Sequence, residues 1–504
     1  MPHAMYQKRD IKECDVNCGE KCIMGSNISK CKNSGVCPLR RKIMLYEKYL
    51  NVIDEKRDKV TGVSDGIWDN AEIRYHEFRS SRILSGALEE EGFSVERGIG
   101  GMPTAFRAVY GNGHPAIGVL AEFDALEGLN QKAGVTAPEN IPGPDVGHGC
   151  GHNLFAGGSF AAVLAVKRYI EETGNGSVTL FGCPAEESGA GKAFLAREGV
   201  FAGMDAVIGW HPEKMYMVRT RPSLANLGYT YYFKGIPSHA GGSPEKGRSA
   251  LDAVELMNVG ANFLREHMPT TCRVHYAIVD AGGTAANVVQ AHAAVSYTVR
   301  ANTLKEVQEL HRRVDLIAQG AAMMTETTVT SKFNAGYSEV ILIPTLQKTV
   351  NEALHDIPLP VPTAEDIAFG RKLQETFVMT EEEKAAPVYA EKVLDPAPPK
   401  AHGGSTDTAD VSWNCPTVQI HIGTWAKGTP GHSWQAVAQG KSRYAKEAML
   451  YAGKAVAGTA IRLMEHPELI AKAKAEHAEL TKGGYVSPIP ADVKAPVCYE
   501  TGPF

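Results

Sequence analysis

The spacing of apolar residues along the chain changes from a helical to a strand-like pattern near residue 92. Before that point, apolar residues recur at helical intervals and predict one helix over residues 42–60 and a second from about Ile67 to a glycine stop at Gly92. After it, short apolar runs predict buried strands. These predicted strands span residues 94–97, 104–110, 116–121, 177–183 and 206–210, with a helix at 154–173 between the third and the fourth.

The order of strand, loop, helix and strand is typical of an α/β protein, in which ligands collect beyond the carboxyl ends of the strands. Four polar side chains fall at such ends, namely Asp124, Glu186, Glu187 and His211. Because four polar groups scattered at random would not each follow an apolar strand, we expect a functional site at this edge of the sheet. The predicted fold class is α/β, with a mixed sheet flanked by helices.

Residues 223–338 carry a different pattern, which predicts an inserted domain. The β-α-β-β-α-β order of its elements indicates a ferredoxin-like α+β fold. The chain would then consist of a Cys-rich extension (1–40), this insert, and a main domain in two parts (41–222 and 339–504). The strands of the insert are expected at 225–234, 273–281, 288–301 and 326–337, and its helices at 248–268 and 303–324.

The last third of the chain returns to the pattern of the main domain. Residues 340–400 indicate a helix, an acidic turn at Glu381–Glu383 that we interpret as a solvated face, and a Pro-rich surface loop. A strand is predicted at 417–422, followed by two helices at roughly 441–464 and 466–481.

The composition is that of an ordinary globular protein and argues against two classes of partner. The chain has 504 residues, 43% of them hydrophobic and 22% charged, and a formal net charge of −5. This balance gives no reason to expect nucleic acid or an anionic membrane as a partner. No apolar stretch follows the first charged residues and none reaches membrane-spanning length, so we expect a cytoplasmic protein.

Half of the ten cysteines lie within the first 37 residues. In a chain without a secretory signal, such a cluster indicates an extra metal or an iron–sulfur cluster rather than disulfides. Its spacing fits no zinc or ferredoxin pattern, so reduced thiols in a small extension remain the alternative. The five residues are Cys14, Cys18, Cys22, Cys31 and Cys37.

A Gly-rich turn at residues 145–153 brings a thiol and two imidazoles together just before an apolar helix. Cys150 and His152 lie two positions apart, and Gly149 and Gly151 allow the backbone to curl so that both side chains reach one centre. Cys and His are preferred protein ligands of zinc-like metals. A Cys-x-His pair can also be a buried structural pair, so the metal interpretation depends on further ligands downstream.

Such ligands follow. Glu187 and His211 end two predicted strands, and His432 lies in the Gly-flanked segment 428–433. A two-metal hydrolytic centre needs several ligands of this kind and a carboxylate that takes a proton from water. Glu186 is free for that role, because consecutive residues at a strand end point in different directions. Taken singly, each residue has a structural alternative: a surface pair, a strand cap or a hydrogen-bonded loop histidine.

Seven segments between about residues 65 and 460 carry a family resemblance. They are Ala121–Leu126, Gly147–Asn153, Pro184–Glu187, Ile236–Gly241, Gly282–Val289, Gly404–Trp413 and Gly428–Ser433. In this order they resemble the metallo-amidohydrolase family of aminoacylase-type and indole-acetyl-amino acid hydrolases, and within it the p-aminobenzoyl-glutamate hydrolase branch. The resemblance implies a zinc-exopeptidase-like fold and hydrolysis of amide bonds. The N-terminal cysteines lie outside it.

The resemblance also implies a metal centre with assigned roles. Two divalent metal ions, manganese or zinc, would be held by five side chains, with the thiolate able to bridge them. Glu186 would be the general base, and Asp124 would orient a ligand histidine. The five ligands would be Cys150, His152, Glu187, His211 and His432.

For the insert at 223–338, the resemblance implies a lid and dimerisation domain of a homodimer. His239, and with it Asn287, would reach the active site of the partner protomer and stabilise the oxyanion. The alternative for His239 is a local strand-turn residue. Asn153 departs from the family pattern, since many relatives carry Asp directly after the metal-binding His, and we interpret it as a marker of the aminobenzoyl-glutamate branch.

Three hypotheses about function follow. The first is an amidohydrolase that acts on a small N-acyl or N-aroyl amino acid, such as p-aminobenzoyl-glutamate, or on a dipeptide; the same scaffold could instead remove an amino group from an aromatic amine. The second is a non-catalytic binding or regulatory protein whose Cys-rich arm is its working part. The third is an enzyme whose N-terminal thiols bind a further metal or cluster.

Overall fold

The computed structural model describes residues 38–397 and 404–498, and the chain divides into two compact units, residues 1–48 and 49–504. The first described helix, α1, spans Pro38–Glu55. The five N-terminal cysteines and the possible cluster site they form lie outside the described residues. Across the part of the chain that is described, no helix combines the length and the apolar character needed to cross a bilayer.

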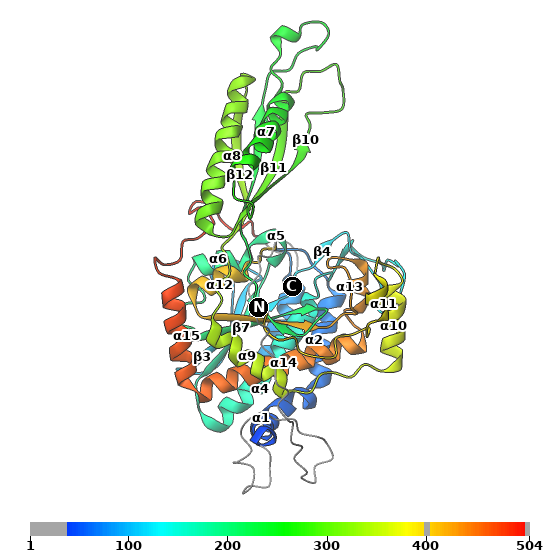
Figure 1. Cartoon of the computed structure of the whole chain (residues 1–504), viewed down its shortest axis with the longest axis vertical. Helices are drawn as coiled ribbons and strands as arrows, with labels where there is room; N and C mark the ends of the chain where they lie inside the picture. Colours follow the sequence, from blue (N-terminus) through cyan, green and yellow to red (C-terminus); the bar gives the residue numbers. More distant parts are fainter. Residues whose placement is uncertain (1–37, 398–403, 499–504) are drawn as a thin grey trace, which may run out of the picture. The chain divides into compact units, whose positions relative to one another are not determined.

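Residues 49–504 are built around a mixed sheet of seven strands (Figure 1). In sheet order the strands are β1 (Ser94–Arg97), β2 (Phe106–Gly111), β6 (Ser177–Cys183), β3 (Ala116–Glu122), β7 (Ala206–Glu213), β13 (Thr417–Gly423) and β8 (Met217–Val218). The central strands β6, β3, β7 and β13 run parallel, and the outer pairs are antiparallel. Every residue of β3 and β6 is buried, as expected of parallel strands covered on both faces.

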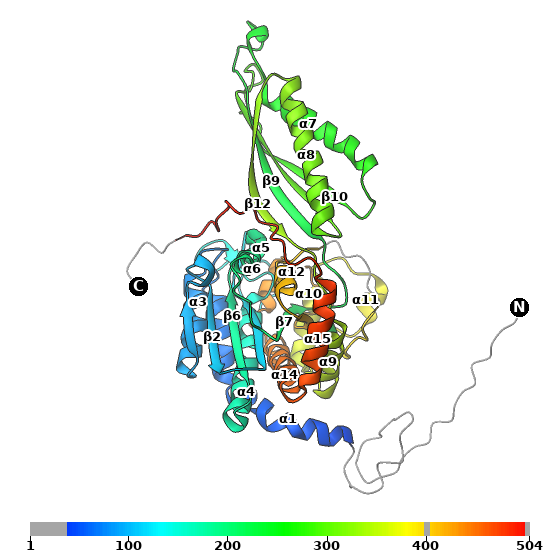
Figure 2. The ribbon, with the colours of Figure 1, turned by 90° about the vertical axis from the view of Figure 1, so that its left-hand side faces the viewer.

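Helices flank this sheet (Figure 2). The long helix α4 (His152–Thr173) is buried over most of its length, because it packs against β3 and against α14 (Arg443–Glu465). A short antiparallel pair, β4 (Leu126–Glu127) and β5 (Val146–Gly147), closes the loop before α4. The other helices are α2 (Arg57–Asp69), α3 (Phe78–Glu90), α5 (Glu186–Gly189), α6 (Gly191–Arg197), α9 (Pro344–Asp356), α10 (Ala364–Gln374), α11 (Glu381–Ala385), α12 (Thr408–Asn414), α13 (Trp434–Gln439) and α15 (Pro467–Leu480).

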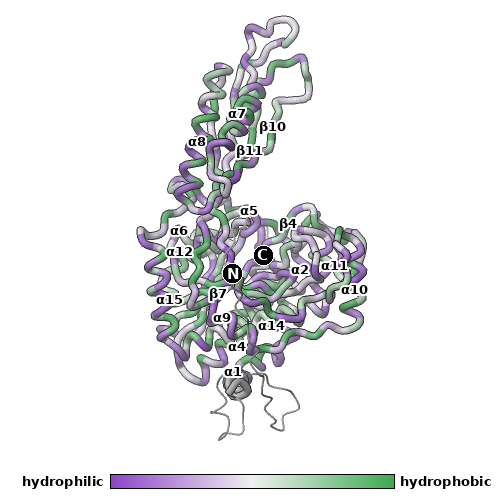
Figure 3. Tube along the Cα trace, in the orientation of Figure 1, coloured by the Kyte–Doolittle hydropathy of each residue, from purple (hydrophilic) through white to green (hydrophobic). Residues whose placement is uncertain are grey.

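The insert contains a second, antiparallel sheet of four strands in the order β10-β11-β9-β12. Its elements are β9 (Ala225–Lys234), α7 (Ala250–Leu264), β10 (Arg273–Asp280), β11 (His292–Ala301), α8 (Leu304–Met324) and β12 (Thr328–Tyr337). Hydrophobic and hydrophilic residues alternate along α8 (Figure 3), and its buried side packs on β9, β11 and α7. The α/β fold class with a ferredoxin-like insert is confirmed.

The predicted helix from Ile67 to Gly92 is wrong. α2 ends at Asp69, and α3 begins only at Phe78. Between them Tyr75 has φ 64, a left-handed conformation that a helix excludes. The carboxylate of Glu77 accepts the backbone N–H groups of Tyr75 and of Ala185, so a contact with a distant segment fixes the break.

Smaller corrections concern three other segments. The predicted helix at 42–60 is interrupted at Lys56, between α1 and α2. The acidic residues Glu381–Glu383 do not form a turn but begin helix α11, whose capping box is made by Thr380 and Glu383. The strand expected from residue 288 begins at His292, because the residues before it bond to another segment: the N–H of Val289 donates to the carbonyl of Ser238, and the N–H of Ala250 donates to the carbonyl of Gln290.

Candidate metal centre

The Gly-rich turn leads into α4 through a glycine whose backbone has the left-handed conformation. Gly151 is the N-cap of α4, with φ 76 and ψ 24. A Cβ at this position would lie 3.0 Å from atoms of Pro212 and of Trp425, so both the backbone angle and the space demand glycine. The turn thereby places Cys150 and His152 side by side at the start of the helix.

Asp124 orients two parts of the centre. The fully buried His152 has its Nδ1 2.9 Å from Oδ1 of Asp124, which assigns a proton to Nδ1 and leaves Nε2 as the atom that a metal would bind. Oδ2 of Asp124 accepts a 2.8 Å hydrogen bond from the backbone N–H of Glu187. One carboxylate therefore aligns an imidazole and the backbone of a second candidate ligand.

His211 reaches the same place from β7. Its Nδ1 lies 2.7 Å from the carbonyl oxygen of Pro212, which leaves Nε2 facing Sγ of Cys150 at 3.4 Å. The sulfur and one nitrogen of each of His152 and His211 lie within 4.8 Å of one another. This spacing suits ligands arranged around a single cation. His211 lies inside β7, which runs on to Glu213, and not after its end as predicted.

A second group of donors forms around the same sulfur. Oε1 of Glu187 lies 3.3 Å from Nε2 of His432, and both fall within 4.8 Å of Sγ of Cys150. His432 has φ 52, and its backbone N–H donates to the carbonyl of Gly149, which ties this distant segment to the Gly-rich turn. Although burial opposes it, the hydrogen bond from His432 and the positive charge of the two nearby imidazoles hold the pKa of Glu187 at about 2, so the carboxylate is ionised.

These residues fit a pair of divalent cations. Cys150 belongs to both groups, so two cations held there would share its sulfur. The buried atoms Nε2 of His152 and Oε1 of Glu187 make no well-directed hydrogen bond among the described residues, although Oε2 of Glu122 lies 3.1 Å from the first and Nε2 of His432 lies 3.3 Å from the second. Polar atoms gathered in this way suit a shared metal. Burial raises the pKa of the Cys150 thiol, so a thiolate at this position requires an adjacent positive charge.

Glu186 stands beside the two groups on a strained turn. Ala185, Ser188 and Ala190 have φ 59, 61 and 61, and this run of left-handed residues turns Glu186 and Glu187 apart. The separation that we predicted from the end of a strand is therefore produced by the turn α5 that follows it. Glu186 lies within 4.8 Å of a nitrogen of His152, and its Oε1 accepts a 3.1 Å hydrogen bond from Oγ1 of Thr406.

The environment of Glu186 suits a group that takes up and returns a proton. Burial and the negative charges of Glu122, Asp407 and Glu187 raise its pKa well above the ordinary value, against the opposing charge of Lys192. A carboxyl group with a raised pKa is a feature of general acid–base catalysis near neutral pH.

Three buried charged residues that were not among the predicted site residues lie around this carboxylate. Nζ of Lys192 lies 2.7 Å from Glu122 and 2.6 Å from Asp407, and none of the three side chains is exposed by more than 1%. Oε2 of Glu122 lies 3.1 Å from Nε2 of His152. The position of Glu122, two residues before Asp124 at the end of β3, was an available signal. Lys192 gives none, because its partners are distant in sequence.

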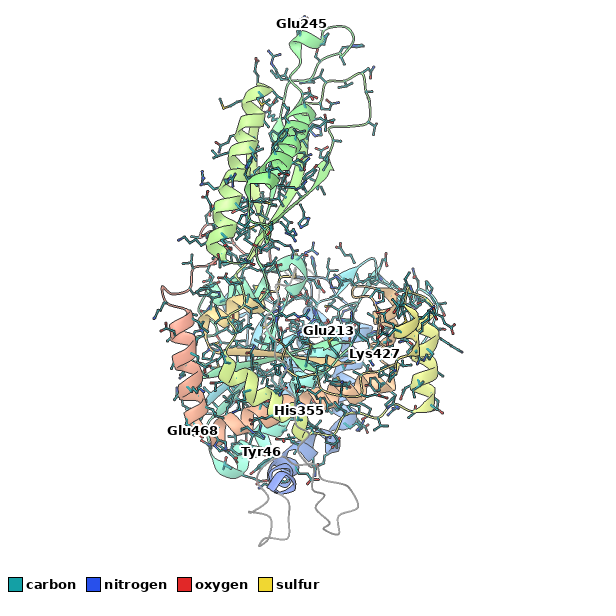
Figure 4. All side chains as sticks on the ribbon, viewed as in Figure 1. Tyr46, Glu213, Glu245, His355, Lys427 and Glu468 are labelled. Atoms are coloured by element: carbon teal, nitrogen blue, oxygen red, sulfur yellow. The ribbon has the colours of Figure 1, made fainter. Side chains whose placement is uncertain are left out.

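His239 and Asn287 lie on two neighbouring backbone segments that are separate from this cluster. The backbone N–H of Ala240 donates to the carbonyl of Asn287, and both side chains are exposed. In the described ranges, neither residue makes a hydrogen bond or ion pair with the cluster around Cys150. Glu245 comes a few residues after His239 in the sequence. It lies at the far end of the insert, away from the strand ends that join the insert to the rest of residues 49–504 (Figure 4).

Asn153 contributes to packing rather than to the charge of the centre. Its Nδ2 donates to Oγ of Ser64 and to the carbonyl of Gly440, each at 3.1 Å, and the side chain is fully buried. The amide therefore joins the start of α4 to α2 and to the loop before α14. An aspartate could not make these two donations, which gives a physical reason for the departure noted in the sequence.

Comparisons with known proteins agree with this architecture. A model of the peptidase family M20/M25/M40 matches residues 119–432. One of the subunits of the p-aminobenzoyl-glutamate hydrolase of Escherichia coli (strain K12) is 41% identical over 472 residues, covering 89% of this chain and 98% of that protein. The Xaa-Arg dipeptidase of Homo sapiens is 29% identical over 86% of this chain and 93% of its own.

A solved structure shares the fold. The YXEP protein of Bacillus subtilis, a dinuclear metal-binding peptidase of the M20 family, superimposes with a TM-score of 0.53 at 16% identity. The match covers 83% of this chain and 99% of that one. At this identity the similarity is one of fold.

Proposed function

Since the chain belongs to the peptidase family M20/M25/M40 and is a hydrolase that acts on amide bonds, we propose that it is a two-metal amidohydrolase with Glu186 as general base. One observation carries the proposal. Two groups of donors, from segments far apart in the chain, share the sulfur of Cys150 and lie beside a carboxylate that belongs to neither group.

The cations would be held by the five residues of those groups. Cys150, His152 and His211 would bind one, and Cys150, Glu187 and His432 the other. Manganese and zinc are both compatible with imidazole, thiolate and carboxylate donors. When bound, such cations supply Lewis acidity, which polarises an amide carbonyl and lowers the pKa of a water molecule.

The side chains of the protein would carry the proton transfers. Glu186 would take a proton from the attacking water and return it to the departing nitrogen. Asp124 fixes the proton of His152 on Nδ1 and so keeps Nε2 available as a donor atom. Thr406 holds one oxygen of Glu186 and leaves the other free for the water.

Glu186→Gln tests the role of the base. We expect the variant to bind as much metal as the wild type, because Glu186 is not among the five donors, but to lose turnover by about 100- to 10,000-fold. Metal per chain is measured by inductively coupled plasma mass spectrometry and turnover by release of product. Full activity in this variant would remove Glu186 from the mechanism.

We propose that the insert makes a homodimer through residues 223–338, and that His239 and Asn287 act at the partner's site. Nδ1 of His239 accepts backbone N–H groups from Gly241 and Gly242, at 3.1 and 3.0 Å, so Nε2 carries the proton and can donate to an oxyanion. His239 and Asn287 are exposed on the surface of their own chain, which suits a residue that acts in trans.

The edge strand β10 supports this assembly. It exposes Tyr276, Ile278 and Val279 by 37%, 46% and 58%, and an apolar edge of this kind is a template for pairing with another chain. Ile278→Asp should therefore shift the protein to monomers in sedimentation velocity. Val378→Asp, which changes an equally apolar and fully exposed residue outside the insert, is the matched control. Unchanged dimers, or monomeric wild type, would contradict the assembly.

We propose that the substrate is a small N-acyl or N-aroyl amino acid, resembling the p-aminobenzoyl-glutamate of the Escherichia coli relative, or a dipeptide, as in the human one. Removal of an amino group from an aromatic amine is the alternative, because it needs the same activated water. A screen of metal-loaded protein against all three classes, with products identified by mass spectrometry, separates them. Release of ammonia without amide cleavage would favour the alternative.

Two further predictions concern the whole chain. The hypothesis of a non-catalytic binding or regulatory protein that works through its Cys-rich arm does not fit a chain that is a hydrolase of amide bonds. Iron and sulfide assays on protein with and without residues 1–40 test the extra metal or cluster at Cys14, Cys18, Cys22, Cys31 and Cys37. A cytoplasmic location stays a prediction from the sequence.

A further inference from the structure

Two segments far apart in the sequence are joined beside Glu186 by a buried ion pair. The backbone N–H of Lys192 donates to Oδ2 of Asp407 at 2.7 Å, and its Nζ lies 2.6 Å from Oδ1, although the two residues are 215 positions apart. The same Nζ lies 2.7 Å from Oε1 of Glu122. Because a buried ion that loses its partner is costly, this contact holds the two segments firmly together.

Lys192 and Asp407 each lie close in the sequence to one residue of a second contact, the hydrogen bond between Thr406 and Glu186. Lys192 lies in α6, directly after the turn that carries Glu186, and Asp407 directly follows Thr406. The hydroxyl of Thr406 donates to Oε1 of Glu186 at 3.1 Å. The ion pair therefore fixes the distance between the donor and the acceptor of this hydrogen bond.

The direction of the hydroxyl proton is also fixed. Oγ1 of Thr406 accepts the backbone N–H of Thr408 at 3.3 Å, so its own hydrogen is left to point at Glu186. The segment is held at its other end, where the backbone N–H of Leu224 donates to the carbonyl of Gly404 at 3.1 Å. The hydroxyl is thus a prearranged donor rather than a freely rotating group.

We propose that Thr406 is a positioning residue for Glu186, which it keeps in the orientation needed for proton transfer, and that the Lys192–Asp407 ion pair sets its place. The proposal rests on the proposed function, in which Glu186 is the base. A base oriented by a third group is an arrangement that recurs where a side chain must remove a proton efficiently.

Three variants test it. In Thr406→Val the hydroxyl is replaced by a methyl group of similar size, and we expect kcat to fall by about 10- to 100-fold, the effect of one hydrogen bond to a charged group, with KM and metal content unchanged. Thr406→Ser keeps the hydroxyl and should recover most of this loss. Thr408→Val is the matched control, because its buried Oγ1 has no hydrogen-bond partner in the described part of the chain.

The outcomes distinguish this proposal from the one on which it rests. Wild-type kcat in Thr406→Val, equal losses in the Ser and Val variants, or a loss of metal in place of a loss of kcat would each overturn the positioning role. In a protein that already carries Glu186→Gln, Thr406→Val should cause no further loss of kcat, so that the double variant is no slower than Glu186→Gln alone. An inactive Glu186→Gln with a fully active Thr406→Val would refute the positioning role alone, whereas a fully active Glu186→Gln would refute the base itself.

Discussion

Strands β3 and β6 of the seven-stranded sheet are buried along their whole length, whereas β10 of the four-stranded sheet buries only one residue fully. Beside the first sheet the buried charges are paired, Asp124 with His152 and Lys192 with Asp407. The second leaves His239 and Asn287 on the surface. The main domain thus pairs its buried polar groups within one chain, whereas the insert leaves its two candidate site residues exposed, as our proposal of a site shared between protomers requires.

The difference follows from the energetics of burial. Charges that are removed from water must be paired, so the buried cluster is defined by contacts across more than 200 residues of sequence. Exposed polar groups carry no such requirement, and substitutions there should affect turnover without affecting the fold. The following predictions test this contrast between the two regions.

The largest effect is expected at Cys150, the donor common to both groups. Cys150→Ala should lower bound metal below one ion per chain and activity by at least about 1,000-fold, because it weakens both sites. His432→Ala removes a donor from one group only and should leave about one ion. Metal per chain and kcat are measured on the same preparations, and two ions retained in Cys150→Ala would contradict the sharing.

His239→Ala should lower kcat by about 100- to 1,000-fold, the usual effect of losing one oxyanion donor, with metal content and thermal stability unchanged. Coexpression of the His239→Ala chain with the Glu186→Gln chain tests whether His239 acts at the site of the partner protomer. If His239 acts in trans, the mixed dimer contains one intact site, and about a quarter of the wild-type activity should return. No recovery in isolated mixed dimers would place His239 within its own chain's site.

The smallest effect concerns the junction of the two regions. Asp410 of α12 is fully buried and accepts hydrogen bonds from the backbone and hydroxyl of Ser338, directly after β12, and from the hydroxyl of Tyr485. Burial raises the pKa of Asp410 from 3.8 to about 7, although the hydrogen bonds oppose this shift. The folded state therefore holds the proton more tightly than the unfolded state.

This shift makes stability fall as the pH rises. The contribution of Asp410 should be complete below pH 4 and be lost as the pH approaches 7, with a slope of up to about 1.4 kcal/mol per pH unit. Urea unfolding of the metal-free protein between pH 4.5 and 7.5 measures it. Asp410→Asn cannot titrate and should show a flatter dependence, while parallel curves for the two proteins would contradict the assignment.

Local patterns in the sequence were sufficient to predict those parts of the structure that depend on residues close together in the chain. The spacing of Cys150 and His152, and the strand ends at Asp124 and Glu187, identified side chains that the structure brings together, although their roles stay predictions. The β-α-β-β-α-β order likewise gave the fold class of the insert, which is confirmed.

Features that depend on distant contacts were not predictable in this way. The break between α2 and α3 rests on Glu77 accepting the N–H of Ala185, 108 positions away. The partners of Lys192 lie 70 and 215 positions from it, so no local pattern marks a buried lysine there. Hydrophobic periodicity reports which face of an element is buried, but it does not report what that face meets.

The sharing of one sulfur by two cations is tested most directly by anomalous diffraction from crystals of the manganese- or zinc-loaded protein. The account predicts two anomalous peaks per chain, with Sγ of Cys150 bound to both, His152 and His211 at one, and Glu187 and His432 at the other. A single peak, or two peaks with Sγ of Cys150 bound to neither, would contradict it.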